Sequence, residues 1–254
     1  MQVSRETYLR WAIDPALWVE ERLGISPDPK QKDILRSRSK RMLLCCSRQW
    51  GKTTVCSWEG AHGSIFHPGT FTIIVAPVFR QSVELLDKIT TIMDTAEVAL
   101  KEKKQTELIL HNGSRILALP GDGANIRGFS AVHRVIIDEA AFIPGNAKLM
   151  EAVRPMLATT GGALKLLSTP NGKSGHFFEW WQNGGPDWER FKVTADDCPR
   201  ISREFLDGER NDLAPGLFMQ EYYCEFLDTI HSVFLNEDTR DAISDAVEPL
   251  FKIA

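Results

Sequence analysis

A short polar loop ending in Gly51-Lys52-Thr53-Thr54 carries the first residues whose types and spacing could do chemistry. In a phosphate-binding loop, backbone N–H groups surround the phosphates of a nucleotide, a lysine neutralises the β- and γ-phosphate oxygens, and the next hydroxyl binds Mg²⁺. Lys52 and Thr53 fit these roles, although Cys46 stands where the first glycine of the usual pattern would be. Gly-Lys-Thr also occurs at ordinary helix starts, but the apolar run before it and the helix-compatible segment after it favour a phosphate-binding loop.

A second motif lies about ninety residues further on, where the β-branched run Val135-Ile136-Ile137 stops at Asp138 and Glu139. Such a run is typical of a buried parallel strand. Hydrolysis of a nucleotide needs one carboxylate to hold the water shell of Mg²⁺ and a second to polarise the attacking water. We assign the first role to Asp138 and the second to Glu139. Alone, the pair would more often be a solvated strand end; together with the phosphate-binding loop it predicts hydrolysis.

The elements that must position these motifs alternate between strand and helix patterns. This alternation predicts an α/β fold, a mainly parallel sheet flanked by helices on both faces, with ligands at the carboxyl ends of the strands. Asn112-Gly113 between two apolar runs predicts a hairpin. We expect an ATPase-type core over residues 27–195 and a smaller, mostly helical lid or linker subdomain from residues 1–26 plus 196–254. The strands are expected in the apolar run before the loop, at residues 70–76, in the run that stops at Asp138 and Glu139, and at residues 163–169 and 189–194.

The composition limits which partners and metals the protein is expected to bind. The 254 residues are 43% hydrophobic with a formal net charge of -4, so no overall basic field indicates nucleic acid. The local basic run Arg36, Arg38, Lys40 and Arg41 is more often a solvated face than a nucleic-acid contact. No apolar stretch reaches the roughly 18 residues that cross a bilayer, so no membrane partner is expected. The cysteines form no Cys-x-x-Cys pair and the histidines show no ligand spacing, so Mg²⁺ arriving with a nucleotide is the expected metal.

Four segments together resemble the large terminase of tailed bacteriophages. They are residues 47–54, 137–143, 168–172 and 220–226. The resemblance covers most of the chain, and an Arg-Gln-x-Gly-Lys loop replaces the glycine-rich form in this family. It implies a P-loop NTPase of the additional-strand, catalytic-glutamate type. It further implies a homo-oligomeric ring on a portal in the host cytoplasm, which uses ATP and Mg²⁺ to drive double-stranded DNA into a procapsid and works with a small terminase subunit.

The resemblance also assigns roles to individual residues. Gln31 would read adenine, Arg48 would be a second cation in the loop, Thr169 would couple hydrolysis to motion, and Arg127 would be an arginine finger reaching a neighbouring subunit. An exposed loop arginine without catalytic duty is the alternative for Arg127. The expected catalytic residues are Glu139, Lys52, Arg127 and Arg48, and the expected metal-binding residues are Thr53 and Asp138. The expected nucleotide-binding residues are Gln31, Ser47, Arg48, Gln49, Trp50, Gly51, Lys52, Thr53 and Thr54.

A whole large terminase carries a metal-dependent nuclease domain after its ATPase, and this chain ends at Ala254, where that domain should begin. We therefore expect ATP hydrolysis without DNA cleavage. Two other readings stay open at this point. A helicase-type DNA-dependent ATPase shares the motifs but needs a second motor domain, and a non-motor nucleotide switch or assembly module would not need the carboxylate of Glu139.

Overall fold

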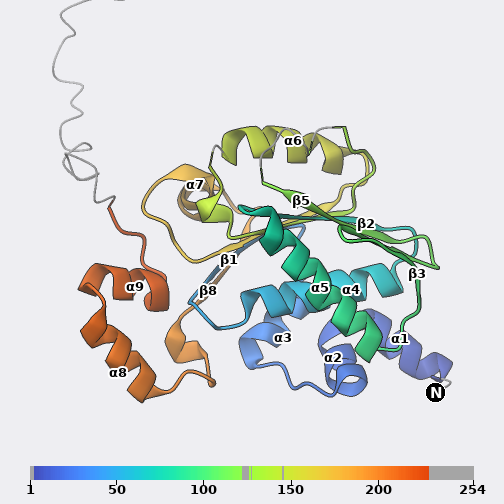
Figure 1. The fold of residues 1–254 in the computed structure, drawn as a ribbon, viewed down its shortest axis with the longest axis horizontal. Coiled ribbons are helices and arrows are strands. Elements are labelled where there is room, and N and C mark those ends of the chain that lie inside the picture. Colours follow the sequence, from blue (N-terminus) through green and yellow to red (C-terminus); the bar gives the residue numbers. More distant parts are fainter. Residues whose placement is uncertain (1–2, 122–125, 127, 145, 229–254) are drawn as a thin grey trace, which may run out of the picture.

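The computed structural model describes residues 3–121, 126, 128–144 and 146–228. Its centre is an eight-stranded sheet in the order β3-β4-β5-β2-β6-β7-β1-β8, with helices on both faces (Figure 1). The expected α/β fold is confirmed. The strands are β1 (Arg41–Cys46), β2 (Phe71–Ala76), β3 (Leu100–Lys103), β4 (Glu107–Leu110), β5 (Arg115–Pro120), β6 (Arg134–Asp138), β7 (Ala163–Ser168) and β8 (Glu189–Val193).

The sheet is parallel except at one edge. β2 pairs in parallel with β5 and β6, β6 with β7, and β1 with β7 and β8, whereas β4 pairs antiparallel with both β3 and β5. The hairpin predicted at Asn112-Gly113 joins β4 to β5, and Gly113 has φ 84°, a conformation that glycine adopts readily. The charged segment before it forms the edge strand β3, most of which is exposed. β7 lies between β6 and β1 and is the additional strand of this fold type.

Helices cover the two faces unequally. The helices are α1 (Arg5–Ile13), α2 (Pro15–Leu23), α3 (Pro29–Arg36), α4 (Lys52–Phe66), α5 (Phe79–Thr95), α6 (Asn146–Ala158), α7 (Gly175–Asn183), α8 (Arg203–Asp212) and α9 (Pro215–Tyr223). Helices α1 to α5 lie on one face of the sheet and α6 and α7 on the other (Figure 1). Met42 and Leu44 of β1 pack into the first layer and Leu43 into the second, which is why this strand is apolar at successive positions.

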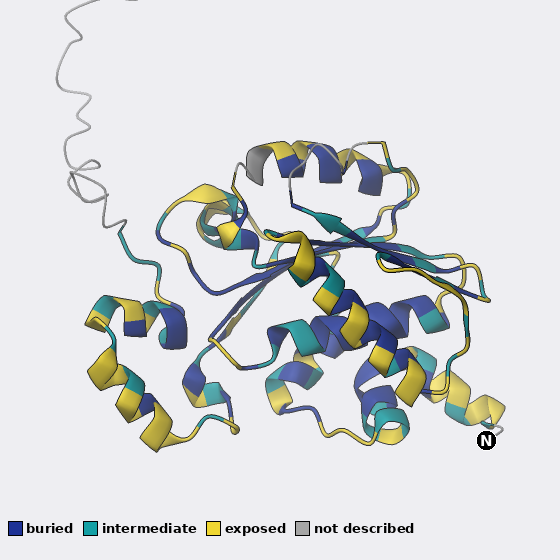
Figure 2. Cartoon of the chain, in the orientation of Figure 1, coloured by how far each residue is buried: buried dark blue, intermediate teal, exposed yellow. Residues whose placement is uncertain are grey.

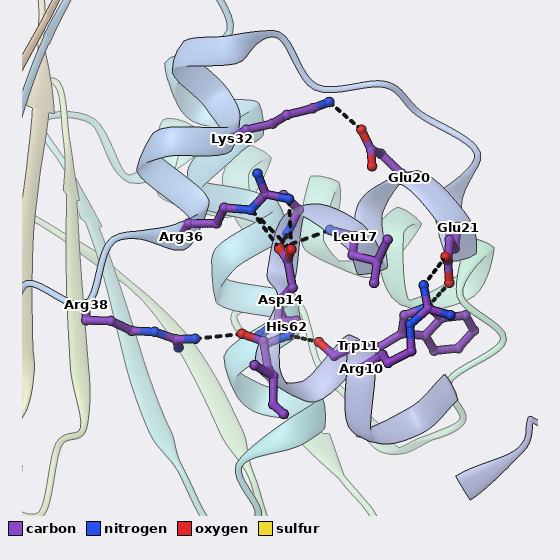
Figure 3. Close-up of polar contacts among 12 residues, drawn as sticks. Arg10, Trp11, Asp14, Leu17, Glu20, Glu21, Lys32, Arg36, Arg38 and His62 are labelled. Atoms are coloured by element: carbon purple, nitrogen blue, oxygen red, sulfur yellow. Dashed lines mark hydrogen bonds and ion pairs between the residues drawn. The ribbon is translucent and has the colours of Figure 1, made fainter. Parts of the chain in front are cut away.

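Two arginines of the basic run before β1 bind groups of the N-terminal helices. Arg36 binds the carboxylate of Asp14 at 2.8 Å, and Asp14 also caps α2 by accepting hydrogen bonds from two backbone N–H groups (Figure 3). Arg38 donates to the backbone carbonyl of Ile13 at 2.6 Å. The ring Nε2 of His62 in α4 lies 2.7 Å from the backbone carbonyl of Trp11 in α1. These contacts hold α1 and α2 against α3 and α4.

The C-terminal helices form a separate small cluster. Leu206 of α8 packs with Phe218 and Tyr222 of α9, while α8 is mostly exposed and the sheet is mostly buried (Figure 2). Trp11 and Trp18 of α1 and α2, by contrast, belong to the same hydrophobic cluster as β1. The division into a core and a lid subdomain stays a prediction. Among the described residues, no helix combines the length and the apolar character needed to cross a membrane.

Candidate nucleotide site

Three neighbouring parallel strands bring the two sequence motifs to one edge of the sheet. Cys45 of β1 is in register with Ser168 of β7, and Leu167 of β7 is in register with Asp138 of β6. Since parallel strands end on the same side, the loop after β1 and the carboxylates after β6 meet across the end of β7.

The loop between β1 and α4 has the backbone shape of a phosphate cradle. Gln49 and Gly51 have φ values of 58° and 101°, and Gly51 caps the N-terminus of α4. A side chain is strained at φ 101°, and a Cβ there would lie 3.4 Å from the amide nitrogen of Gln31. The first N–H groups of α4 have no partner within the helix and therefore favour an anion. Backbone hydrogen bonds hold the start of the loop, from Ser47 to Val193 at 2.8 Å and from Arg48 to Glu221 at 3.0 Å.

Lys52 and Glu139 meet in this site. The ammonium Nζ of Lys52 lies 2.8 Å from Oε1 of Glu139, and the lysine side chain is only 11% exposed. Burial by itself lowers the pKa of Lys52, but attraction to Glu139 and Asp138 outweighs it and the pKa is raised. The lysine therefore keeps its charge, and the cation at the end of the loop shares one site with the acid that follows β6.

Asp138 is held by the motif around it. Its Oδ1 accepts from the backbone N–H of Glu139 at 2.9 Å and its Oδ2 accepts from the hydroxyl of Thr53 at 3.2 Å. Burial, followed by repulsion from Glu139, raises the pKa of Asp138. A carboxylate and a hydroxyl oxygen are ligands that Mg²⁺ accepts, and it usually keeps several waters besides. The donor set therefore fits the ion that the sequence predicts.

Glu139 sits on an unusual backbone. Its φ is 48°, in the left-handed region, and the hydroxyl of Ser168 lies 3.4 Å from its Oε2. Ser168 also accepts from the N–H of Ala141 at 3.3 Å. A non-glycine residue in this conformation typically stores about 1–3 kcal/mol and is found most often at functional sites.

A pocket of about 560 Å³ opens in front of these residues. Arg48, Gln49, Lys52, Glu139 and Thr169 line it, as the sequence predicts for a common site. Four further lining residues were not anticipated: Pro77, Val78, Gln81 and Phe142. They come from the segments that follow β2 and β6, so their position at the carboxyl ends of neighbouring strands was the signal that could have found them.

Arg48 is engaged by α9. Its Nε lies 2.5 Å from Oε2 of Glu221, with the arginine side chain 62% exposed and the glutamate 9% exposed. The hydrogen bond that Arg48 donates to Glu221, together with the negative charge of Glu221, raises the pKa of Arg48. Sequence reasoning included Glu221 in a matching segment without giving it a role.

The remaining predicted residues differ in their access to the pocket. Gln31 is buried in α3 and bonds reciprocally with Asp28. Ser47 and Trp50 are fully buried and Thr54 is half-buried, so their side chains support the loop and do not line the pocket. Arg127 lies outside the described residues, and its predicted role is not addressed by the geometry.

An eight-stranded sheet with an additional strand between the loop strand and the acidic strand defines a P-loop NTPase fold. The family model "Terminase large subunit, T4likevirus-type, N-terminal" matches residues 43–241. The chain belongs to the terminase large subunit family.

Individual relatives agree with the family match. The chain is 31% identical over 257 residues to the large terminase subunit of Thermus phage G20c, a match that covers 86% of this chain and 52% of the relative. The chain thus spans about half the length of the curated relatives it matches. The ATPase domain of the Thermus phage P74-26 large terminase has a TM-score of 0.74 and 27% identity, over 84% of this chain and 99% of that one. The large terminase of bacteriophage D6E in complex with ADP has a TM-score of 0.65 and 12% identity, over 85% and 53% of the two chains, a likeness of fold.

Proposed function

We propose that this chain binds and hydrolyses ATP as the motor domain of a phage DNA-packaging machine. The observation that carries the proposal is the convergence of Lys52 and Glu139, 2.8 Å apart at the carboxyl end of the sheet. The solved relatives add support, because one is named an ATPase domain and another was crystallised with ADP.

Each residue then has a task in phosphoryl transfer, where positioning and neutralisation of charge supply most of the catalysis. Lys52 and the N–H groups at the start of α4 bind the β- and γ-phosphates. Glu139 orients water toward the γ-phosphate and accepts its proton. Thr53 and Asp138 would hold Mg²⁺, which neutralises phosphate charge when bound. In the structure Lys52 and Glu139 pair with each other, so a bound triphosphate separates them and leaves Glu139 available to water.

Glu139→Gln tests this proposal. We expect turnover to fall about 10²- to 10⁴-fold, the usual contribution of a general base, with ATP affinity within a few-fold of wild type. Phosphate release gives turnover and titration calorimetry gives affinity. Glu84→Gln, on the exposed side of α5, is the matched control and should leave both unchanged.

Retention of turnover in Glu139→Gln would remove the assigned base. Tight ATP binding by the wild type without hydrolysis at any protein concentration would instead support the nucleotide-switch alternative, since a switch does not need a carboxylate directed at water.

The wider role rests on family membership. We infer translocation of double-stranded DNA into a procapsid, a ring assembled on a portal, cooperation with a small subunit and action in the host cytoplasm. Nucleotide binding would close α8 and α9 against the sheet and hydrolysis would release them, with Thr169 as the coupling residue. Thr169 is buried, lines the pocket and starts a loop whose Gly172 N–H donates to Gln220 of α9 at 3.3 Å, a contact suited to that task. We propose that this segment hydrolyses ATP without cleaving DNA.

A further inference from the structure

Arg200 joins the segment after β8 to the phosphate-binding loop. It belongs to none of the motifs recognised in the sequence. Its Nη2 donates to the backbone carbonyl of Trp50 and lies 3.3 Å from Oδ2 of Asp28. The arginine side chain is 49% exposed, whereas the Asp28 side chain is 3% exposed. One guanidinium therefore connects the chain leading into α8 with the loop and with the start of α3.

Asp28 in turn holds Gln31. The Oδ1 of Asp28 accepts from the N–H of Gln31 at 2.9 Å, and the Oε1 of Gln31 accepts from the N–H of Asp28 at 3.0 Å. One carboxylate oxygen thus binds Gln31 while the other faces Arg200. A change at Arg200 reaches Gln31 through a single, nearly buried side chain.

Gly51 shows how close these groups are to the phosphates. A Cβ built on Gly51 would lie 3.4 Å from Nε2 of Gln31 and 3.8 Å from Nη2 of Arg200. Both side chains therefore border the same small space beside the residue that precedes Lys52. Neither Gln31 nor Arg200 is among the nine residues that line the pocket of Lys52 and Glu139.

We propose that Arg200 is a positioning residue for recognition of the nucleotide base. It fixes the Trp50 carbonyl and Asp28, and so orients the amide of Gln31 toward the base, while Lys52 and Thr53 bind the phosphates independently. This inference rests on the proposed nucleotide site. A purine nucleotide with a hydrogen-bonding edge that an amide can read is the ligand class it serves.

The test separates the base from the phosphates. Binding of ATP, GTP and inorganic tripolyphosphate, each with Mg²⁺, is measured by titration calorimetry for wild type, Arg200→Ala and Arg200→Lys. Arg203→Ala, an exposed arginine three residues further on, is the matched control. KM and kcat for ATP are measured on the same proteins.

We expect Arg200→Ala to weaken ATP binding about tenfold, equivalent to roughly 1.4 kcal/mol, with tripolyphosphate binding within about twofold of wild type. Its KM for ATP rises while kcat stays within about twofold, and its preference for ATP over GTP falls. Arg200→Lys recovers most of the loss, since an ammonium can also donate to a carbonyl and pair with a carboxylate. Arg203→Ala matches wild type.

Several results would overturn the assignment. Equal weakening of ATP, GTP and tripolyphosphate would show a general effect on the loop, and a parallel fall of kcat and melting temperature without rescue by lysine would show a structural role only. Unchanged ATP binding in Arg200→Ala would remove the residue from the site. If wild type itself neither bound nor hydrolysed ATP, the proposed function would fail and this inference with it.

Discussion

At the scale of single residues, the site keeps charges buried that water would otherwise stabilise. Asp138 and Glu139 are adjacent carboxylates, and the ammonium of Lys52 only partly offsets their repulsion. Because burial raises the pKa of Asp138, its ionised form lowers the stability of the folded state at neutral pH. A site of this kind gives up stability for function.

Asp138→Asn should therefore stabilise the nucleotide-free protein at pH 7. Because the pKa of Asp138 is higher in the folded than in the unfolded chain, the protonated carboxyl contributes stability to the folded state below pH 3.8, the ordinary pKa of an aspartate. This stability is lost as the pH rises through the folded-state pKa. The neutral amide of Asp138→Asn restores this stability at pH 7. We expect a gain of roughly 2–4 °C in Tm, the effect of about 1 kcal/mol on a domain of this size. The gain should shrink as pH falls toward the ordinary value. Thermal unfolding measures this gain, with Asp87→Asn on the exposed face of α5 as the control. A lower Tm of Asp138→Asn at pH 7 would contradict the prediction.

At the scale of elements, α4 serves both the site and the fold. Its first residues form the phosphate cradle, and its far end carries His62, which bonds the carbonyl of Trp11 in α1 (Figure 3). Burial lowers the pKa of His62 to about 4, so the ring is neutral at physiological pH. The attachment of α1 thus depends on a histidine that resists protonation.

Acidification should loosen this attachment. Because the folded pKa of His62 is about 4 against an ordinary 6.5, the unfolded chain binds the proton first, and stability falls as pH drops from about 6.5 to about 4. Over this pH range the free energy of unfolding should fall by on the order of 3 kcal/mol. Urea unfolding across this range should show a flatter pH dependence for His62→Gln than for wild type. His111→Asn, in the exposed hairpin, should follow wild type; identical curves for wild type and His62→Gln would refute the assignment.

Helix α9 competes with the nucleotide for Arg48. Glu221 pairs with the Nε of Arg48 and offsets its positive charge, so a phosphate meets a cation that is already partly neutralised. Glu221→Gln should therefore tighten ATP binding by up to about fivefold, the equivalent of roughly 1 kcal/mol for an ion pair whose arginine is largely exposed. Arg48→Ala should weaken binding, and in the double variant Glu221→Gln should have no further effect. Weaker binding in Glu221→Gln alone would show that the ion pair positions Arg48 for the nucleotide.

At the scale of the whole molecule, the chain spans about half of its curated relatives, and its proposed motor action needs neighbours. Arg127 is the residue proposed to act on a neighbouring subunit. An arginine supplied in trans typically contributes about 10³- to 10⁵-fold to turnover. Turnover per subunit should therefore rise with protein concentration in wild type and stay low in Arg127→Ala. Arg80→Ala, an exposed arginine on α5, should behave as wild type; high turnover in dilute protein, unchanged in Arg127→Ala, would exclude the finger.

Local sequence was sufficient for the strands other than the charged edge strand β3, and for the hairpin, the phosphate-binding loop and the acidic strand end, because strand periodicity, Asn-Gly and Gly-Lys-Thr act over a few neighbouring residues. The pairing of Lys52 with Glu139 followed from combining two such local signals with the geometry of parallel strands. Ion pairs between segments that are far apart in the sequence could not be predicted, because no local sequence pattern marks them. Arg48 with Glu221, Arg200 with Asp28, and buried Lys165 of β7 with Glu59 of α4 arise from packing, which brings charges together whatever their separation along the chain.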